Sequence, residues 1–409
     1  MIPDSDELAR GAERVLRSAW REGERDGLRY AFTCPSPRKY AHQWYWDSCF
    51  HAIAWRRYDP ERSREELRTL VRAMQPDGLI PHTVFWHSPA WWRRAPFYAT
   101  LSSFGSLGTA HTQTPVIALA WELVAGDDRE FAREGIEPLK RHFDWLQRDR
   151  DPDGDGLISI IHPDESGLDD SPKYDPVWGR LAHHRPGYFW LVQRSRRLGY
   201  STVEIMERYD EHVEDVLVNV FYALSLRSLS RLIGEGEDGE YLGRARKAER
   251  ALLELCYDER SGLFFDVAFP GERHIDISTW SSLAPLALPS MPEDVRRRLV
   301  EEHLLDPRRY GARVGIPSVS MEERSFRPGF DRWRCWRGPS WINSAWLLVP
   351  RMRELGYEDE AEHIVGSLAM AVAHEGFREY YNPHTGAGLG ARDFGWSTLI
   401  VDLLDASGG

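Results

Sequence analysis

The chain has 409 residues, of which 42% are hydrophobic and 28% are charged, and its formal net charge at pH 7 is −12. This composition is typical of a globular protein that can bury a large core. No Lys/Arg block lies on an aromatic-rich strand pattern, which argues against a nucleic-acid binder. No apolar run approaches the roughly 18 residues that span a membrane, so we expect no membrane partner.

The four cysteines, Cys34, Cys49, Cys256 and Cys335, are scattered without the spacing of metal ligands. They predict neither a disulfide framework nor a zinc site. The acidic N-terminal residues lead into an amphipathic helix and carry no secretion signal. We therefore expect a cytoplasmic protein that uses no metal or other cofactor. The sequence is compatible with a homo-oligomer and leaves the oligomeric state open.

In chain order, helical periodicity predicts alternating amphipathic and strongly apolar helices. An apolar helix must be buried, whereas a helix with one apolar stripe lies outside. The sequence therefore predicts an all-α fold, an (α/α)6 barrel or toroid, as a single domain over 1–409. The apolar helices are expected at 47–55, 114–120, 216–224, 280–286, 340–348 and 395–403, and their amphipathic partners at 6–25, 61–74, 127–149, 238–257, 292–305 and 357–374.

Two long insertions interrupt this pattern, at about 82–112 and 150–212. The second insertion carries Glu165, Asp169 and Asp170 on a turn, and Glu379 lies far downstream. Glycoside hydrolysis needs one protonated carboxylic acid and one ionised carboxylate. Crowding raises the pKa of a carboxyl group, so the 165–170 cluster suits the acid. The chain also has 17 tryptophans, which stack on sugar rings or fill helical cores.

Polar and aromatic residues gather where the predicted inner helices begin. Helix N-termini direct free N–H groups and positive dipole ends at sugar oxygens and carboxylates, so we expect the functional rim there. Taken singly, Asp47 could be only an N-cap, and the tryptophans could be only packing residues. The residues in question are Tyr40, Trp44, Trp46, Asp47, Gln113, Trp336, Gly338 and Trp341.

The loop Asp151–Asp155 has the acidic spacing of a calcium loop, but its twelfth position is His162 and not glutamate. A plain Asp/Gly turn is the preferred interpretation, and calcium is left as the alternative. His183 and His184 are adjacent, and adjacent histidines in a loop rarely share an ion, so a solvated loop is preferred there. The sequence therefore predicts no metal site.

Three segments together resemble glycoside hydrolase family 63 and, more distantly, the trehalases of family 37. They are 165–169 (Glu-Ser-Gly-Leu-Asp), 336–341 (Trp-Arg-Gly-Pro-Ser-Trp), and Glu379-Tyr380 followed by 390–396. The strongest similarity is to the compact bacterial mannosylglycerate/glucosylglycerate hydrolases. It extends from about Tyr40 to Trp396, with the segments in the same order.

The resemblance implies an (α/α)6 barrel that cleaves an α-glycosidic bond with inversion. Asp169 would be the general acid and Glu379 the base that deprotonates water. Such a site needs its two carboxyl groups about 6.5–9.5 Å apart. The resemblance also implies a sugar pocket of Tyr40, Trp44, Trp46, Asp47 and Gln113, and aglycone contacts from Trp336, Gly338 and Trp341.

The chain departs from the related pattern at Asp164 and Cys335, where related hydrolases commonly have Trp and Tyr. Both positions flank the expected pocket, so the particular substrate stays open. Cations for a glycerate carboxylate could come from 91–94 (Trp-Trp-Arg-Arg) or from the Arg185 region, or these could be ordinary surface arginines. Asp170 competes with Asp169 for the role of acid.

We therefore expect an inverting exo-α-glycosidase that acts on a small glycoside, mannosylglycerate or glucosylglycerate, without a cofactor. One alternative is an α-glucosidase of the same fold acting on trehalose or a glucosyl oligosaccharide. Another is a non-hydrolytic sugar-binding or epimerase toroid, since one architecture hosts several functions. Such a protein would need histidine pairs or Asp-rich metal motifs in the mouth, and we find neither among the residues that the sequence places at the rim.

Overall fold

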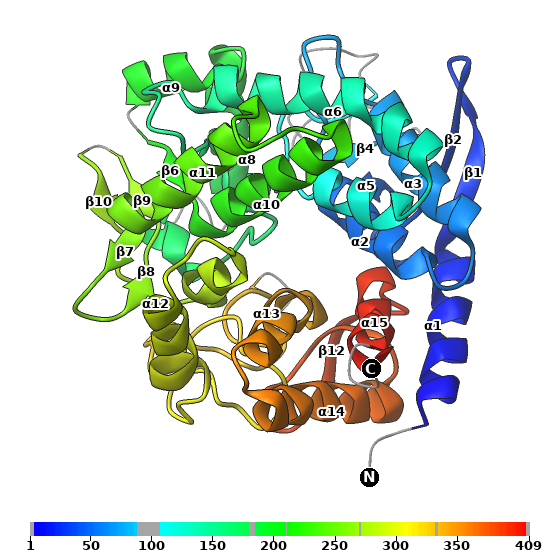
Figure 1. Ribbon diagram of the computed structural model, residues 1–409, viewed down its shortest axis with the longest axis vertical. Helices are drawn as coiled ribbons and strands as arrows, with labels where there is room; N and C mark the ends of the chain where they lie inside the picture. The colour runs from blue at the N-terminus through cyan, green and yellow to red at the C-terminus, as the bar shows by residue number, and fades with distance from the viewer. Residues whose placement is uncertain are drawn as a thin grey trace.

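The computed structural model describes residues 4–87, 107–179, 185–209, 211–269, 271–331 and 334–405, and two concentric rings of helices organise them (Figure 1). The inner ring contains α2 (Tyr45–Trp55), α5 (Ile117–Ala125), α10 (Val216–Ile233), the 3-10 helix η5 (Trp280–Ala287), α13 (Ile342–Glu354), and η7 (Gly395–Leu399) continued by α15 (Ile400–Asp405). The outer ring contains α1 (Ser5–Ala19), α3 (Pro60–Arg72), α6 (Arg129–Arg150), α11 (Glu240–Ala251), α12 (Glu293–Arg298) and α14 (Glu358–Glu375).

Burial explains which helices lie inside. Every residue of α2 is buried, whereas α1 buries one stripe that includes Leu8, Ala12 and Leu16 and keeps its charged residues outside. The π-helical turns η4 (Leu252–Cys256) and η6 (Leu299–Leu304) extend α11 and α12. All the predicted inner and outer helices are present at or near their expected positions. The prediction of an all-α (α/α)6 barrel is confirmed.

The predicted first helix is too long at its C-terminal end. Residues 20–25 form strand β1 (Trp20–Arg25), which pairs antiparallel with β2 (Leu28–Thr33). The turn between them is Asp26-Gly27, and both residues have positive φ, at 54° and 78°. Asp-Gly favours such two-residue hairpin turns, so this dipeptide was the overlooked signal.

The other strands are short and tie loops to the rim of the barrel. They are β3 (Gln43–Trp44), β4 (Thr83–Val84), β5 (Ser159–Ile160), β6 (Val213–Glu214), β7 (Tyr257–Asp258), β8 (Leu263–Phe264), β9 (Val267–Ala268), β10 (Arg273–His274), β11 (Arg378–Tyr381) and β12 (Gly388–Arg392). The pairing of β5 with β6 joins the two ends of the 150–212 insertion. The pair β11 and β12 forms the C-terminal hairpin that carries Glu379.

The 150–212 insertion contains several short helices, which are η1 (Pro163–Ser166), η2 (Pro172–Tyr174), α7 (Asp175–Trp178), α8 (Arg185–Arg197) and α9 (Thr202–Tyr209). The 91–94 segment and the His183-His184 pair lie outside the described residues, and so does the side chain of Arg185. The expectations placed on them therefore stay predictions.

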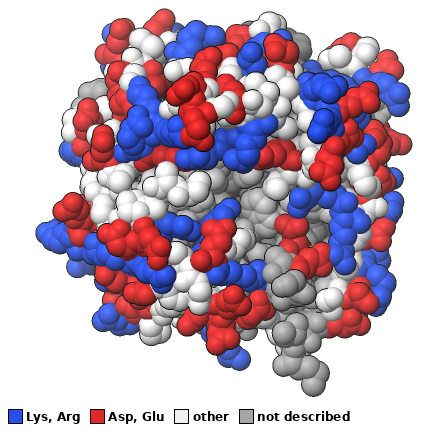
Figure 2. Space-filling model, viewed as in Figure 1, with Lys and Arg blue, Asp and Glu red and all other residues white. Residues whose placement is uncertain are grey.

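The core runs continuously through the barrel and includes the fully buried Trp46, Trp55, Trp121 and Trp280. Contrary to the sequence-based expectation, α10 is long and apolar enough to span a membrane by length and composition. A core helix passes the same test, and 72% of its apolar window is buried by protein. Basic and acidic side chains intermix across the face shown in Figure 2, which carries no extended field of one sign.

Candidate active site

Glu379 lies on β11 with 3% of its surface exposed and is held by three donors. Its Oε1 accepts a hydrogen bond from the Tyr40 hydroxyl at 2.8 Å. Its Oε2 accepts from the Ala391 amide at 2.6 Å and forms an ion pair with Lys39 Nζ at 3.0 Å. A carboxyl group that receives an ammonium, an amide and a hydroxyl is stabilised in its ionised form. The arrangement suits a base.

Glycine at 390 is required by this arrangement. Gly390 has a φ of +67°, and a Cβ added there would lie 2.5 Å from Glu379 Oε2. Only glycine combines the left-handed backbone with so close an approach. The Gly390-Ala391 step thus brings the Ala391 amide to the carboxylate.

The acidic turn contains three carboxyl groups with different partners. Glu165 is 1% exposed and forms a bidentate ion pair with Arg150, at 2.8 and 2.7 Å. Asp170 Oδ1 accepts from the Trp336 amide at 3.0 Å. Asp169 is exposed to solvent, and no other described residue donates a hydrogen bond to its carboxylate. Of the three, Asp169 is the one whose side chain is exposed to solvent, whereas Asp170 Oδ2 is buried and has no hydrogen-bond partner among the described residues.

Electrostatic conditions around Asp169 favour its protonated form. Its side chain reaches solvent, but the surrounding protein limits its hydration, and this desolvation raises its pKa to about 6. The charge of Glu379 raises that pKa further, and the charge of Lys39 lowers it. Burial, reinforced by Asp169, raises the pKa of Asp170 well above its usual value.

Asp47 lies near the two carboxyl groups and is not the N-cap that one sequence interpretation allowed. The N-cap of α2 is Trp44, and Asp47 is the third residue of the helix. Burial raises its pKa well above the usual value, and the charges of Glu379 and Asp169 add to the effect. Gln113 takes the capping role instead, because its Oε1 accepts from the Trp46 amide at 3.0 Å.

Aromatic rings from three segments that are distant in sequence contact one another. Trp336 stacks on Trp341 with ring centroids 3.8 Å apart and planes inclined by 7°. Trp396 contacts Trp341 at 5.5 Å and meets Trp46 edge to face at 5.1 Å. Trp44 meets Tyr40 edge to face at 6.0 Å. Indole rings arranged in this way can stack on the C–H faces of a sugar.

The 336–341 segment is fixed to both the acidic turn and β11. The guanidinium of Arg337 donates from Nε to the Asp170 carbonyl at 2.9 Å and binds both oxygens of Asp175, at 3.0 and 2.6 Å. Gly338 has a φ of +148°, and its amide donates to Ser318. Backbone bonds between Ser340 and Tyr381 complete the link to β11.

All the predicted site residues lie in the described part of the chain, and direct contacts connect most of them. Tyr40 bonds to Glu379, Gln113 bonds to Trp46, and the tryptophans contact one another. The sequence interpretation missed Lys39, Arg150, Ala391 and Trp396 as partners. Lys39 precedes Tyr40 directly, but a lone lysine in a loop carries no signal of its own.

Two further groups of side chains have the chemistry of possible sites. Donor oxygens of Asp151, Asp153 and Asp155 lie within 4.8 Å of one another, and Asp155 Oδ1 accepts from the Leu157 amide at 2.7 Å, as in an ordinary Asp turn. The interpretation of this loop as a plain Asp/Gly turn and its alternative as a calcium loop both stay predictions.

The four cysteines are free thiols, and the Sγ atom of Cys335 lies 3.8 Å from Asp170 Oδ1.

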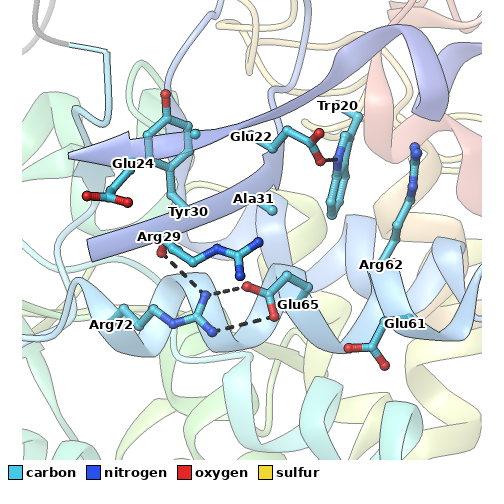
Figure 3. A pocket seen from close by; sticks show the side chains of 11 residues that line it. Trp20, Glu22, Glu24, Arg29, Tyr30, Ala31, Glu61, Arg62, Glu65 and Arg72 are labelled. Atoms are coloured by element: carbon cyan, nitrogen blue, oxygen red, sulfur yellow. Dashed lines mark hydrogen bonds and ion pairs between the residues drawn. The ribbon is translucent and has the colours of Figure 1, made fainter. Parts of the chain in front are cut away.

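A groove of about 790 Å³ lies between the β1–β2 hairpin and α3 (Figure 3). Its charged side chains are largely engaged with neighbours: Arg72 binds Glu65, and Trp20 Nε1 donates to Glu22 at 3.0 Å. No convergent set of catalytic groups faces this space among the labelled residues. We do not regard it as the active site.

A helical toroid that brings carboxyl groups and stacked tryptophans together is typical of glycoside hydrolases of the (α/α)6 class. Residues 40–397 match the family described as the mannosylglycerate hydrolase MGH1-like glycoside hydrolase domain, and the chain belongs to this family. The mannosylglycerate hydrolase of Rubrobacter radiotolerans is 31% identical over 98% of both chains. The glucosylglycerate hydrolase of Mycolicibacterium hassiacum is 28% identical over 90% of this chain and 93% of that protein.

Among solved structures, the family 63 mannosylglycerate hydrolase of Thermus thermophilus, in complex with Tris and D-glycerate, superposes with a TM-score of 0.84. It is 30% identical and covers 97% of this chain and 100% of its own. Membership of glycoside hydrolase family 63 and glycoside hydrolase activity, both expected from the sequence, are confirmed.

Proposed function

We propose that the protein is an inverting exo-α-glycosidase that hydrolyses mannosylglycerate, glucosylglycerate or both to free sugar and D-glycerate. The observation that carries this proposal is the contrast between the two carboxyl groups. Glu379 is surrounded by three donors, while Asp169 has a raised pKa of about 6 and stays available. Related proteins named for hydrolysis of these two glycosides support the substrate class.

In the proposed reaction, Asp169 donates its proton to the glycosidic oxygen as the bond from that oxygen to the anomeric carbon breaks. Glu379 takes a proton from a water molecule, whose oxygen attacks the anomeric carbon from the opposite face. The product sugar is therefore the β-anomer. Asp169 ends ionised and Glu379 ends protonated, and exchange with solvent restores both groups.

The sugar would occupy the space between the α2 N-terminus and Glu379, with the aglycone towards the stacked tryptophans. Asp47 and Gln113 would bind hydroxyl groups, and the aromatic residues would pack against the ring. In this proposal the sugar contacts are Tyr40, Trp44, Trp46, Asp47 and Gln113, and the aglycone contacts are Trp336, Gly338 and Trp341.

Asp169 is preferred to Asp170 as the acid because Oδ1 and the backbone carbonyl of Asp170 already fix the acidic turn to the 336–341 segment. Oδ1 of Asp170 receives the Trp336 amide, and its carbonyl receives Arg337. Moving Asp170 towards a substrate would break the link between the acidic turn and the 336–341 segment. The Asp169 carboxylate accepts no hydrogen bond from another described residue.

We further propose that the 409 residues form one domain that acts in the cytoplasm on a small compatible solute. Four free thiols, three of them buried, suit a reducing compartment. Nothing among the described residues favours a particular oligomeric state.

The test is hydrolysis by the purified protein of mannosylglycerate, glucosylglycerate and trehalose, each measured as released hexose and, for the first two, as D-glycerate. We expect turnover of at least one hexosylglycerate and none in Asp169→Asn. Turnover of trehalose alone would favour the α-glucosidase alternative. A protein that binds these glycosides and cleaves none would overturn the proposal.

A further inference from the structure

Lys39 is in direct contact with the proposed base, and the resemblance to family 63 gives it no role. Its ammonium lies 3.0 Å from Glu379 Oε2 and 4.6 Å from the centre of the Tyr40 ring. The side chain of Lys39 is 45% exposed and that of Glu379 is 4% exposed, so Lys39 approaches the buried carboxylate from the solvent side. Among the described residues, no second Lys or Arg pairs with Glu379.

The two oxygens of Glu379 are used unequally. Oε2 accepts from both Lys39 and the Ala391 amide, which matches the two lone pairs of a carboxylate oxygen. Among the described residues, Oε1 accepts only from the Tyr40 hydroxyl, which leaves it one lone pair. The Tyr40 phenol stays a donor, because burial and the Glu379 charge raise its pKa far above the usual value. Oε1 is therefore the oxygen that can take a proton from water.

Glu379 is surrounded by other acidic groups, whose negative charges disfavour the ionised form of one another. Ionisable groups face it from four segments: Asp47 on α2, Asp169 on the acidic turn, Cys335 before α13 and Tyr380 on its own strand. Arg378, beside it on β11, donates instead to the Gly390 carbonyl at 3.1 Å. The charge of Lys39 also acts on Asp169 and Cys335, in each case favouring the ionised form.

We propose that Lys39 is a positioning residue that keeps Glu379 ionised beside Asp47 and Asp169 and directs proton acceptance to Oε1. This inference rests on the proposed function, in which Glu379 is the base. Without the ammonium, Oε2 would regain a free lone pair and both carboxyl groups would bind protons more readily. An opposite charge at this range shifts carboxyl ionisation by about one pH unit or more.

The experiment compares the pH dependence of kcat/KM for hydrolysis of the hexosylglycerate in wild type, Lys39→Met and Lys39→Arg. Lys140→Met on α6 is a matched control, because that lysine is on the surface and pairs with Glu137 only loosely, at 3.8 Å. In Lys39→Met we expect the acidic limb of the profile, set by Glu379, to move up by about one pH unit. The basic limb, set by Asp169, should move up by less, because Lys39 acts on Asp169 more weakly than Glu379 does. Lys39→Arg should keep limbs close to wild type, and Lys140→Met should be unchanged. A lower rate without movement of either limb would overturn the inference.

A second comparison separates this role from binding of the substrate carboxylate. The same variants are assayed with a hexosylglycerol, which has the same sugar and an uncharged aglycone. If Lys39 acts on Glu379, the limbs move equally with both substrates. If Lys39→Met raises KM only for the hexosylglycerate and leaves the limbs in place, Lys39 is a substrate contact and the inference is wrong.

A third measurement does not depend on turnover. In protein labelled with ¹³C at glutamate carboxyl carbons, the resonance missing from Glu379→Gln identifies Glu379. Its titration midpoint should lie about one pH unit higher in Lys39→Met than in wild type. An unmoved midpoint overturns the inference about Lys39, whereas full activity of Glu379→Gln would overturn the proposed function.

Discussion

The Tyr40 hydroxyl donates to Glu379 Oε1 at 2.8 Å, although the two residues are 339 positions apart. The contact joins the loop before α2 to the C-terminal hairpin. Ser36 reinforces the same junction by donating to the Arg392 carbonyl at 3.0 Å. The proposed base therefore reaches its position only when the first and last parts of the barrel meet.

The first prediction concerns the proposed acid and base. Asp169→Asn and Glu379→Gln should each reduce kcat by at least about a thousandfold, since each removes one of two carboxyl groups that the reaction needs. Binding should survive, measured as a ligand-induced rise in Tm. In Asp170→Asn the amide oxygen can still accept from the Trp336 amide, so activity should stay within about tenfold of wild type. Loss of activity in Asp170→Asn alone would reverse the assignment.

The second prediction concerns pH. The pKa of Asp169 is raised to about 6, and Asp169 must be protonated to act as an acid. As far as Asp169 sets the rate, kcat/KM should keep its full value below pH 6, where Asp169 is protonated. Above pH 6 it should fall about tenfold per pH unit. Initial rates measured from pH 4 to 9 show this decline. A value of kcat/KM that stays constant up to pH 9 would show that protonation of Asp169 does not control the rate.

The third prediction concerns the buried pair of Glu165 and Arg150, whose side chains are 1% and 3% exposed. Glu165→Gln leaves the guanidinium without its counter-charge and should lower the free energy of unfolding by about 3–5 kcal/mol. Urea unfolding followed by tryptophan fluorescence measures this change. The control is Glu13→Gln, which breaks an exposed pair with Arg17 and should change that free energy by less than about 1 kcal/mol. Equal effects of both variants would contradict the structural role given to Glu165.

The fourth prediction concerns Gly167, whose φ is +75° and where a Cβ would lie 2.4 Å from the Trp46 ring. Gly167→Ala should destabilise the protein and impair sugar binding, because Trp46 must move. Gly234→Ala is the matched control, since Gly234 has a φ of +81° but no atom within 4 Å of the added Cβ. The control isolates the backbone strain, about 1–2 kcal/mol. Equal losses of stability and unchanged KM in both would exclude the contact with Trp46.

Much of the fold could be predicted from the sequence, because inner and outer helices differ in how many of their faces are apolar. The first helix was predicted too long because the charged run 20–25 also fits a helical pattern, and the Asp26-Gly27 turn that makes it a strand was overlooked. The 3-10 form of η5 was not predicted. Pro285 lies within it, and proline removes a backbone donor from an α-helix.

The candidate site could be predicted only in part. Residue types and order pointed to Asp169 and Glu379, but they could not separate Asp169 from Asp170. That distinction depends on the Trp336 amide, which comes from a segment 166 positions away. The same reason explains why Arg150 and Lys39 were missed as partners of Glu165 and Glu379. Long-range pairs of charged residues leave no local pattern.

The most direct test of the central claim is proton NMR of the enzyme with mannosylglycerate and glucosylglycerate, recorded before mutarotation equilibrates the free sugar. Inverting hydrolysis by Asp169 and Glu379 predicts that the β-anomer appears first. First appearance of the α-anomer would mean retention of configuration and would contradict the role of Glu379 as the base for water.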